Sequence, residues 1–151
     1  MLARLSTVLT EIRSLQSQLV LLVSSPGGGK TELIRQLGIN NEMKVVNVGA
    51  VLGKMLVSVP KRRRPILTSV KMREIAEWYA NGDLLLLDNI ELLFDQTLKL
   101  DPLDLLKQHA HSRRVVVVWP GELVGGRLIY AQMGHPEYQD YGLDGLVPFE
   151  I

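Results

Sequence analysis

The chain has 151 residues, of which 46% are hydrophobic and 22% are charged, and its formal net charge is +1. This size and composition predict one globular domain, and a total charge so near zero does not by itself require a nucleic-acid partner. Cysteine is absent, which excludes disulfides, thiolate metal sites and cysteine nucleophiles. No apolar run approaches the roughly 20 residues of a membrane-spanning helix, and Glu11 and Arg13 interrupt any secretory signal, so we expect a cytoplasmic protein with no membrane contact.

The N-terminal residues 1–16 predict an amphipathic helix. Its apolar residues recur at helical spacing and are Leu2, Leu5, Val8, Leu9, Ile12 and Leu15. We expect this face to pack on a sheet rather than to bind a partner.

The next stretch has the order of a phosphate-binding loop. A short apolar run, Leu19–Val23, precedes Ser24-Ser25-Pro26-Gly27-Gly28-Gly29-Lys30-Thr31, and a helical segment at 32–37 follows and is expected to stop at Gly38. Glycines without a Cβ let backbone N–H groups close on phosphates, and a helix start adds free donors and a positive dipole end. The pattern G-x-x-x-x-G-K-[ST] is met except at its first position, where Ser24 replaces glycine.

This loop predicts a set of nucleotide-binding residues. They are Ser25, Pro26, Gly27, Gly28, Gly29, Lys30 and Thr31. Lys30 can reach the β- and γ-phosphates, and the Thr31 hydroxyl can ligate Mg²⁺.

A second strand is expected at 44–48, ended by Gly49, and a short helix at 50–57. Beyond it lies a basic segment at 60–65 whose prolines, one at each end, predict an exposed loop. Its cations are Lys61, Arg62, Arg63 and Arg64. Three interpretations stay open: a solvated loop, a contact with nucleic-acid phosphates, or an arginine supplied to a neighbour's nucleotide.

A helix is predicted at 69–80, with Ser69 as its cap, and a buried parallel strand at 84–87, where the residues are all leucine. Asp88 follows at the carboxyl end of that strand, where ligands sit in open α/β sheets. We expect Asp88 to organise Mg²⁺ opposite Thr31.

Asn89 bears on catalysis. Many ATPases with such a strand carry glutamate directly after the aspartate, as the base that polarises the attacking water. Asparagine cannot accept a proton at neutral pH, and Glu91, two residues further on, replaces that base only if the chain turns suitably. The sequence therefore supports nucleotide binding, with at most slow hydrolysis, better than fast hydrolysis.

The rest of the chain predicts a helix that begins near 90–94, a helix from Asp101-Pro102 through Ala110, and a buried strand at 115–119. That strand ends on Trp119, whose indole N–H is the polar group it offers to a γ-phosphate. A last strand is expected at 127–131. Residues 132–151 predict an irregular tail, either mobile or docked as an arm on another chain.

These elements predict an α/β three-layer sandwich with a five-stranded, mostly parallel sheet. We expect one domain (1–151), comprising the N-terminal helix (1–16), a nucleotide-binding core (17–131) and the tail (132–151). In order and spacing the core resembles that of the AAA+ ATPases, although residues 132–151 do not predict the helical lid that such proteins usually carry. The motif Asp88-Asn89-Ile90-Glu91 is similar to the second acidic motif of some initiator-like members.

The whole chain also resembles a narrower group, the small P-loop proteins of BREX bacteriophage-defence systems (the BrxF group). The short length, the loop at 24–31, the proline-flanked arginine cluster at 60–65 and the segment 84–94 carry this resemblance. It implies a bacterial cytoplasmic defence component that works beside other BREX proteins, including a large ATPase.

ATP is the expected nucleotide. Guanine-specific P-loop proteins need an Asn/Thr-Lys-x-Asp element, and its nearest match here, Leu98-Lys99-Leu100-Asp101, has leucine at the first position. The first hypothesis is an ATP-binding module that assembles with itself or with partners, with Arg127, or Arg113 or Arg114, acting across the interface. The second is a nucleic-acid-binding protein that uses ATP as a switch and contacts DNA through Lys61–Arg64. The third is a small P-loop kinase, although residues 121–126 provide no arginine-rich flap.

Overall fold

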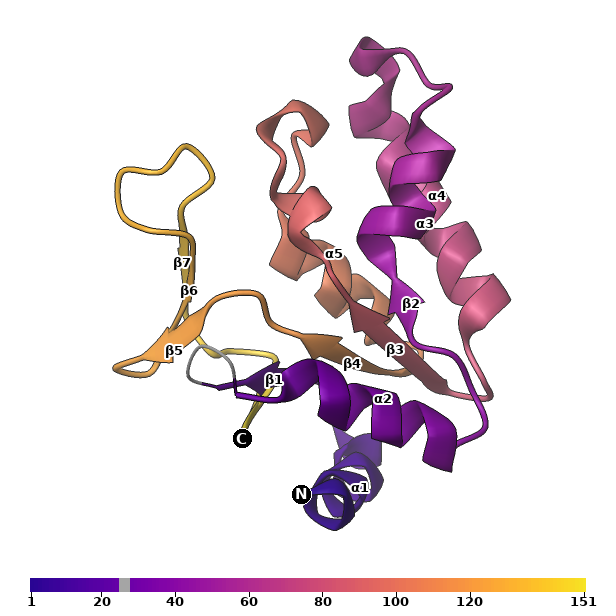
Figure 1. Ribbon diagram of the computed structural model, residues 1–151, viewed down its shortest axis with the longest axis vertical. Coiled ribbons are helices and arrows are strands. Elements are labelled where there is room, and N and C mark those ends of the chain that lie inside the picture. The colour runs from indigo at the N-terminus through magenta and orange to yellow at the C-terminus, as the bar shows by residue number, and fades with distance from the viewer. Residues whose placement is uncertain (25–27) are drawn as a thin grey trace.

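The structure is a computed structural model that describes residues 1–24 and 28–151. It is an α/β fold built on a five-stranded parallel sheet with the strand order β2-β3-β4-β1-β8 (Figure 1). The strands are β1 (Leu19–Val23), β2 (Val46–Asn47), β3 (Leu84–Asp88), β4 (Arg114–Val118) and β8 (Val147–Glu150). The predicted nucleotide ligands Ser25, Pro26 and Gly27 lie outside the described residues.

Helices cover both faces of this sheet and make a three-layer arrangement. One face carries α1 (Leu2–Glu11), its extension η1 (Ile12–Ser14) and α2 (Lys30–Asn40). The other carries α3 (Val48–Leu56), α4 (Arg64–Tyr79) and α5 (Pro102–His109). All five residues of β1 are buried because alternate side chains enter the two cores, Val20 and Leu22 on the α2 side and Leu19, Leu21 and Val23 on the other.

The predicted face of the N-terminal helix largely holds, since Leu5, Leu9 and Ile12 are buried against the sheet, whereas Leu15 is 45% exposed. Every helix in the described part of the chain is too short or too polar to cross a bilayer.

Two glycines have a different local role from the one that the sequence predicts. α2 does not stop at Gly38 but continues to Asn40, and a Cβ on Gly38 would lie 3.0 Å from the Met43 carbonyl oxygen. Gly49 does not end a strand at 44–48, because only Val46–Asn47 is extended and α3 begins at Val48. Asn47 caps α3 by accepting a 3.0 Å hydrogen bond from the Ala50 N–H. Both glycines therefore serve close packing inside helices rather than chain reversal.

The basic segment is exposed as expected, but it is not a loop. Lys61–Arg63 form a 3₁₀ turn, η2, and α4 starts at Arg64 with Pro65 in its first turn, where a missing N–H costs nothing. Ser69 therefore lies inside α4 and does not cap it. Likewise the helix expected after Ile90 is only the 3₁₀ turn η3 (Glu91–Phe94), followed by a second short turn, η4 (Gln96–Leu98).

The C-terminal region differs most from the prediction. The strand expected at 127–131 is β6 (Arg127–Tyr130), and it lies in a separate antiparallel sheet between β5 (Glu122–Val124) and β7 (Gln139–Tyr141). Gly125 and Gly126 form the turn between β5 and β6 with positive φ values of 56° and 75°, the backbone of a tight hairpin. This small sheet lies beside the carboxyl ends of β1 and β4 in Figure 1.

The predicted irregular tail instead completes the main sheet. β8 pairs in parallel with β1, with Phe149 opposite Leu22. Phe149 is only 4% exposed, and the Arg4 guanidinium lies 5.0 Å from its ring centroid. Pro148 is compatible with this strand because β8 is an edge strand and does not need every ladder donor. The core therefore extends beyond residue 131 to the last residues of the chain.

Candidate nucleotide site at the carboxyl edge of the sheet

Lys30 stands at the centre of the candidate site. It is the first residue of α2, directly after Gly29, whose φ of 82° is the left-handed conformation that glycine favours. The Lys30 Nζ donates a 2.6 Å hydrogen bond to the Trp119 carbonyl oxygen just beyond β4. Burial lowers the pKa of Lys30, and the negative charges of Asp88, Glu91 and Glu122 partly offset this. The lysine is thus held at the carboxyl edge of the sheet amid three carboxylates.

Thr31 and Asp88 line the same small cavity. Thr31 follows Lys30 in α2, and Asp88 ends β3, with β4 between β3 and β1 in the sheet. Together with Ile34, Arg35, Val45 and Asn47 they line a cavity of about 180 Å³. The fold therefore brings the predicted magnesium-binding pair together from two distant parts of the sequence.

Lys30 itself lines a larger cavity, of about 500 Å³. Its lining residues come from the end of β1, the start of α2 and the small antiparallel sheet, and they are Ser24, Lys30, Pro120, Gly121, Glu122, Ile129, Ala131 and Gln132. Glu122 belongs to none of the motifs recognised in the sequence. Its only sequence signal is its place shortly after the predicted strand at 115–119, because ligands collect where parallel strands end.

Trp119 does not present its indole to this cavity. Its side chain is fully buried, and its Nε1–H donates a 3.2 Å hydrogen bond to the Ile129 carbonyl oxygen. The ring packs edge-on against Phe94 and Tyr141, at centroid distances of 5.7 and 6.0 Å. The group that β4 offers to the site is therefore the Trp119 carbonyl, which accepts from Lys30.

Asn89 has a structural task. Its φ of 54° is positive, a conformation that asparagine tolerates better than most residues. Its Nδ2 donates a 2.8 Å hydrogen bond to the Asn47 side-chain oxygen, and its carbonyl oxygen accepts one of 2.9 Å from the Gly49 N–H. A Cβ on Gly49 would meet the Asn89 side chain at 2.9 Å. Asn89 thus joins the end of β3 to the start of α3.

The other predicted catalytic residues are dispersed. Glu91 begins η3, close enough for its charge to act on Lys30. Arg127 lies in β6 and forms an ion pair with Asp140, with 2.8 Å between Nε and Oδ1.

Of the glycines predicted to bind phosphate, Gly28 and Gly29 lie in the described part of the chain, between β1 and α2.

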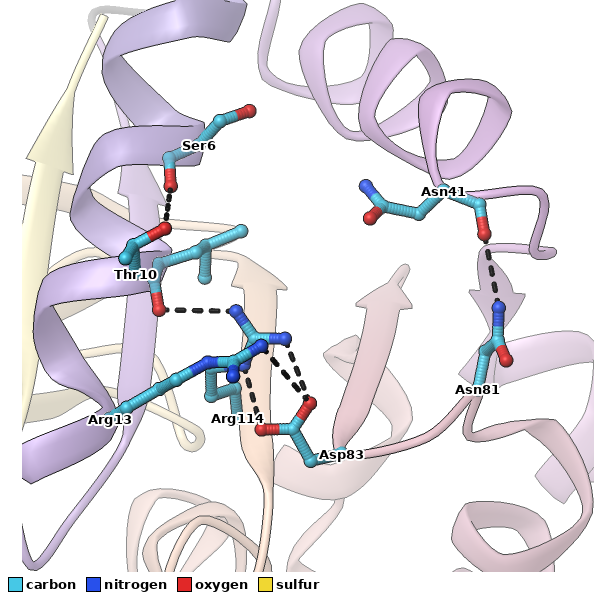
Figure 2. A network of polar contacts seen from close by, with 8 residues as sticks. Ser6, Thr10, Arg13, Asn41, Asn81, Asp83 and Arg114 are labelled. Atoms are coloured by element: carbon cyan, nitrogen blue, oxygen red, sulfur yellow. Dashed lines mark hydrogen bonds and ion pairs between the residues drawn. The ribbon is translucent and has the colours of Figure 1, made fainter.

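The two arginines at the start of β4 lie at the opposite edge of the sheet. Arg114 donates to both carboxylate oxygens of Asp83, at 2.8 and 3.0 Å, and to the Leu9 carbonyl oxygen at 3.1 Å (Figure 2). These bonds hold the pKa of the Asp83 carboxyl below its usual value. Arg113 donates to the Ala76 carbonyl oxygen at 3.0 Å. Both guanidinium groups therefore stabilise the domain by joining the start of β4 to other segments of the same chain.

The basic segment lies at the tip of the α3–α4 hairpin, at the top of the view in Figure 1. Lys61, Arg62 and Arg63 are exposed, and among the described residues no carboxylate forms an ion pair with them. Arg64 is partly buried and donates from Nε to the Val59 carbonyl oxygen at 3.0 Å.

No protein-family model matches the chain, and a search of curated proteins finds no match either. Within the described ranges, histidine, aspartate and glutamate side chains nowhere gather in groups of three or more that could hold a metal ion. The fold and the site define an α/β protein with a five-stranded parallel sheet. Lys30, Thr31 and Asp88 lie together at the carboxyl ends of its strands.

Proposed function

We propose that this chain is a P-loop protein that binds ATP with Mg²⁺. The observation that carries the proposal is that Thr31 and Asp88, from α2 and β3, line one cavity beside Lys30. Their oxygen ligands are of the kind that Mg²⁺ prefers, and the start of α2 presents backbone donors of the kind that bind phosphate. Mg²⁺ bound there would offset charge on the phosphate oxygens, and Lys30 would exchange the Trp119 carbonyl for a phosphate oxygen.

For the biological setting, we propose a cytoplasmic component of a bacterial BREX-type phage-defence system. The support is the resemblance in sequence to the small P-loop proteins of those systems and, more broadly, to the AAA+ core. On this proposal the chain assembles with itself or with other BREX components, including a large ATPase, when it binds nucleotide.

The experiment measures ATP·Mg²⁺ affinity by calorimetric titration and particle mass by light scattering in the same samples. We expect Lys30→Ala to weaken ATP binding by roughly 10- to 100-fold, since it removes a charge-assisted hydrogen bond to phosphate. Lys54→Ala is the matched control, because Lys54 is an exposed lysine on α3 that lines neither of the two cavities described above. Equal affinity in wild type and Lys30→Ala would refute the proposal, and an unchanged mass with ATP would refute nucleotide-driven assembly.

A second candidate function, nucleic-acid binding with ATP as a switch, is favoured by the exposed cations at the α3–α4 tip. We expect the double variant Lys61→Glu, Arg63→Glu to weaken duplex DNA binding and to lower the slope of log affinity against log salt by about 2. ATP affinity should stay unchanged, because the tip lies away from Lys30. DNA binding that is equal in wild type and variant would rule this function out.

A further inference from the structure

We propose that Glu122 is the catalytic base of this site and that it accepts a proton from the water that attacks the γ-phosphate of ATP. This inference rests on the proposed nucleotide binding and adds to it a hydrolytic activity and the residue that performs it.

Glu122 shares a cavity with Lys30. Glu122 is the only acidic residue among the described residues that line the 500 Å³ cavity, and Lys30 and Ser24 line the same cavity. Because Lys30 marks where the terminal phosphates of a bound nucleotide would lie, a carboxylate in the same cavity is in the right region for a water beyond the γ-phosphate.

The backbone at Glu122 is held firmly, as a catalytic base requires. Glu122 begins β5 and is paired with Ile129 in β6. The preceding Gly121 is pressed so closely on β6 that a Cβ there would overlap the Ile129 carbonyl oxygen, at 1.8 Å. The Trp119 indole donates to that same oxygen. Trp119, Gly121 and Glu122 thus all contact Ile129, and these three contacts fix the backbone from which the Glu122 side chain projects.

Asn89 and Glu91, the other candidates for the base, are less well placed than Glu122. The Asn89 amide donates to Asn47 and has no basic atom to offer. Glu91 influences Lys30 through its charge, yet it is not part of the cavity lining. Glu122 combines both properties, because it lines the cavity and its charge also acts on Lys30.

The reaction balances with ATP and water alone. The water oxygen forms a bond to the γ-phosphorus while the bond from that phosphorus to the bridging oxygen breaks, and ADP leaves with the electron pair. The water proton passes to the Glu122 carboxylate and from there to solvent, which restores the base. Lys30 remains on the phosphate oxygens throughout and stabilises their charge.

The test compares wild type with Glu122→Gln, which keeps the side-chain shape and removes the basic oxygen. We expect ATP·Mg²⁺ affinity within about twofold of wild type and single-turnover phosphate release slowed by roughly 10²- to 10⁴-fold. Glu122→Asp should recover part of the rate. Glu137→Gln is the control, because Glu137 is a partly exposed glutamate in the connection between β6 and β7, does not line the cavity, and should leave both quantities unchanged.

Each other outcome overturns the inference in a distinguishable way. If wild type binds ATP but releases no phosphate, or if Glu122→Gln releases it at the wild-type rate, Glu122 is not the base and the binding proposal stands. A loss confined to Glu91→Gln would assign the base to Glu91. If wild type does not bind ATP at all, the proposed function fails together with this inference.

Discussion

The side chain of Lys30 reaches across the carboxyl edge of the sheet and donates a 2.6 Å hydrogen bond to the main-chain carbonyl of Trp119. The same tryptophan is anchored by its indole to Ile129 in β6. One residue thus connects the start of α2 to the small antiparallel sheet. A nucleotide that draws Lys30 onto its phosphates must release one end of this connection.

That exchange gives a spectroscopic prediction. The chain has two tryptophans, of which Trp119 is fully buried beside Lys30 and Trp78 is 83% exposed on α4. In a Trp78→Phe variant, ATP·Mg²⁺ should change the intrinsic fluorescence, because the hydrogen bond at the Trp119 carbonyl is broken. A further Lys30→Met substitution should abolish the change. A Trp119→Phe variant in which Trp78 reports the same change would contradict this origin.

The Asp83–Arg114 pair predicts a pH dependence of stability. Hydrogen bonds from Arg114 lower the pKa of Asp83 in the folded protein. The unfolded chain therefore takes up the proton first, so the stabilisation is present above the unfolded pKa of about 3.9 and disappears as the pH falls through the lower folded value. We expect Asp83→Asn to lower the free energy of unfolding by about 1 kcal/mol at pH 7, a modest value because 47% of the Asp83 side chain is exposed.

Urea unfolding of wild type and Asp83→Asn from pH 7 down to pH 3 measures this, and the two curves should converge at the acid end. Glu74→Gln, which removes a partly exposed ion pair with Lys71, should change the free energy of unfolding by no more than about 0.5 kcal/mol. A constant difference at every pH would show that the Asp83 carboxylate is not the source.

Two glycines inside helices should respond in opposite directions to alanine. A Cβ at Gly53 in α3 would meet only Leu92 at 3.8 Å, so Gly53→Ala should raise the free energy of unfolding by about 0.5–1 kcal/mol through better helix propensity. A Cβ at Gly38 in α2 would press on the Met43 carbonyl oxygen at 3.0 Å and on Val45 at 3.3 Å. Gly38→Ala should therefore lower it by roughly 1–3 kcal/mol. Thermal unfolding of both variants measures these changes in stability. A Gly38→Ala variant more stable than wild type would contradict the close packing described at Gly38.

Placing glutamate at residue 89 should not create a better hydrolase. Asn89→Glu puts a side chain poorly suited to positive φ at 54° and removes the hydrogen bond to Asn47, so we expect a loss of about 1–3 kcal/mol in the free energy of unfolding. Asn89→Asp is the control that keeps a residue tolerant of this φ. Phosphate release measured alongside should not rise in either variant, and a marked increase in Asn89→Glu would show that residue 89 faces the nucleotide.

Phe149 should contribute as much to the stability of the fold as a residue in the centre of the core. It is 4% exposed and packs into the core beneath α1 and α2. Phe149→Ala should lower the free energy of unfolding by about 3–5 kcal/mol. Glu150→Ala, at the exposed neighbouring position of β8, should cost no more than about 0.5 kcal/mol. A small loss in Phe149→Ala would mean that β8 does not complete the sheet in solution.

The amino-acid sequence by itself determined the elements whose signals are local. Continuous apolar runs predicted β1, β3 and β4, because a strand buried on both faces needs apolar residues at every position. The Asp101-Pro102 pair predicted the start of α5, where the Asp101 carboxylate accepts hydrogen bonds from the backbone of Leu103 and Asp104. The order of strand, glycine-rich turn and helix also predicted Lys30 and Thr31 as site residues, and the leucine run at 84–87 predicted Asp88 at the carboxyl end of its strand.

Only the tertiary structure decided features that depend on distant partners. β8 has only four residues, one of which is a proline, and this pattern is too short to predict a strand. The strand forms because β1 offers it an edge with which to pair. The roles of Asn89 and Gly38 follow from neighbours at Asn47 and Met43 that no local pattern identifies. Glu122 enters the candidate site because the β5–β6 hairpin folds back beside Lys30. Sequence periodicity records which residues are buried, but it does not record which strand or side chain will lie against them.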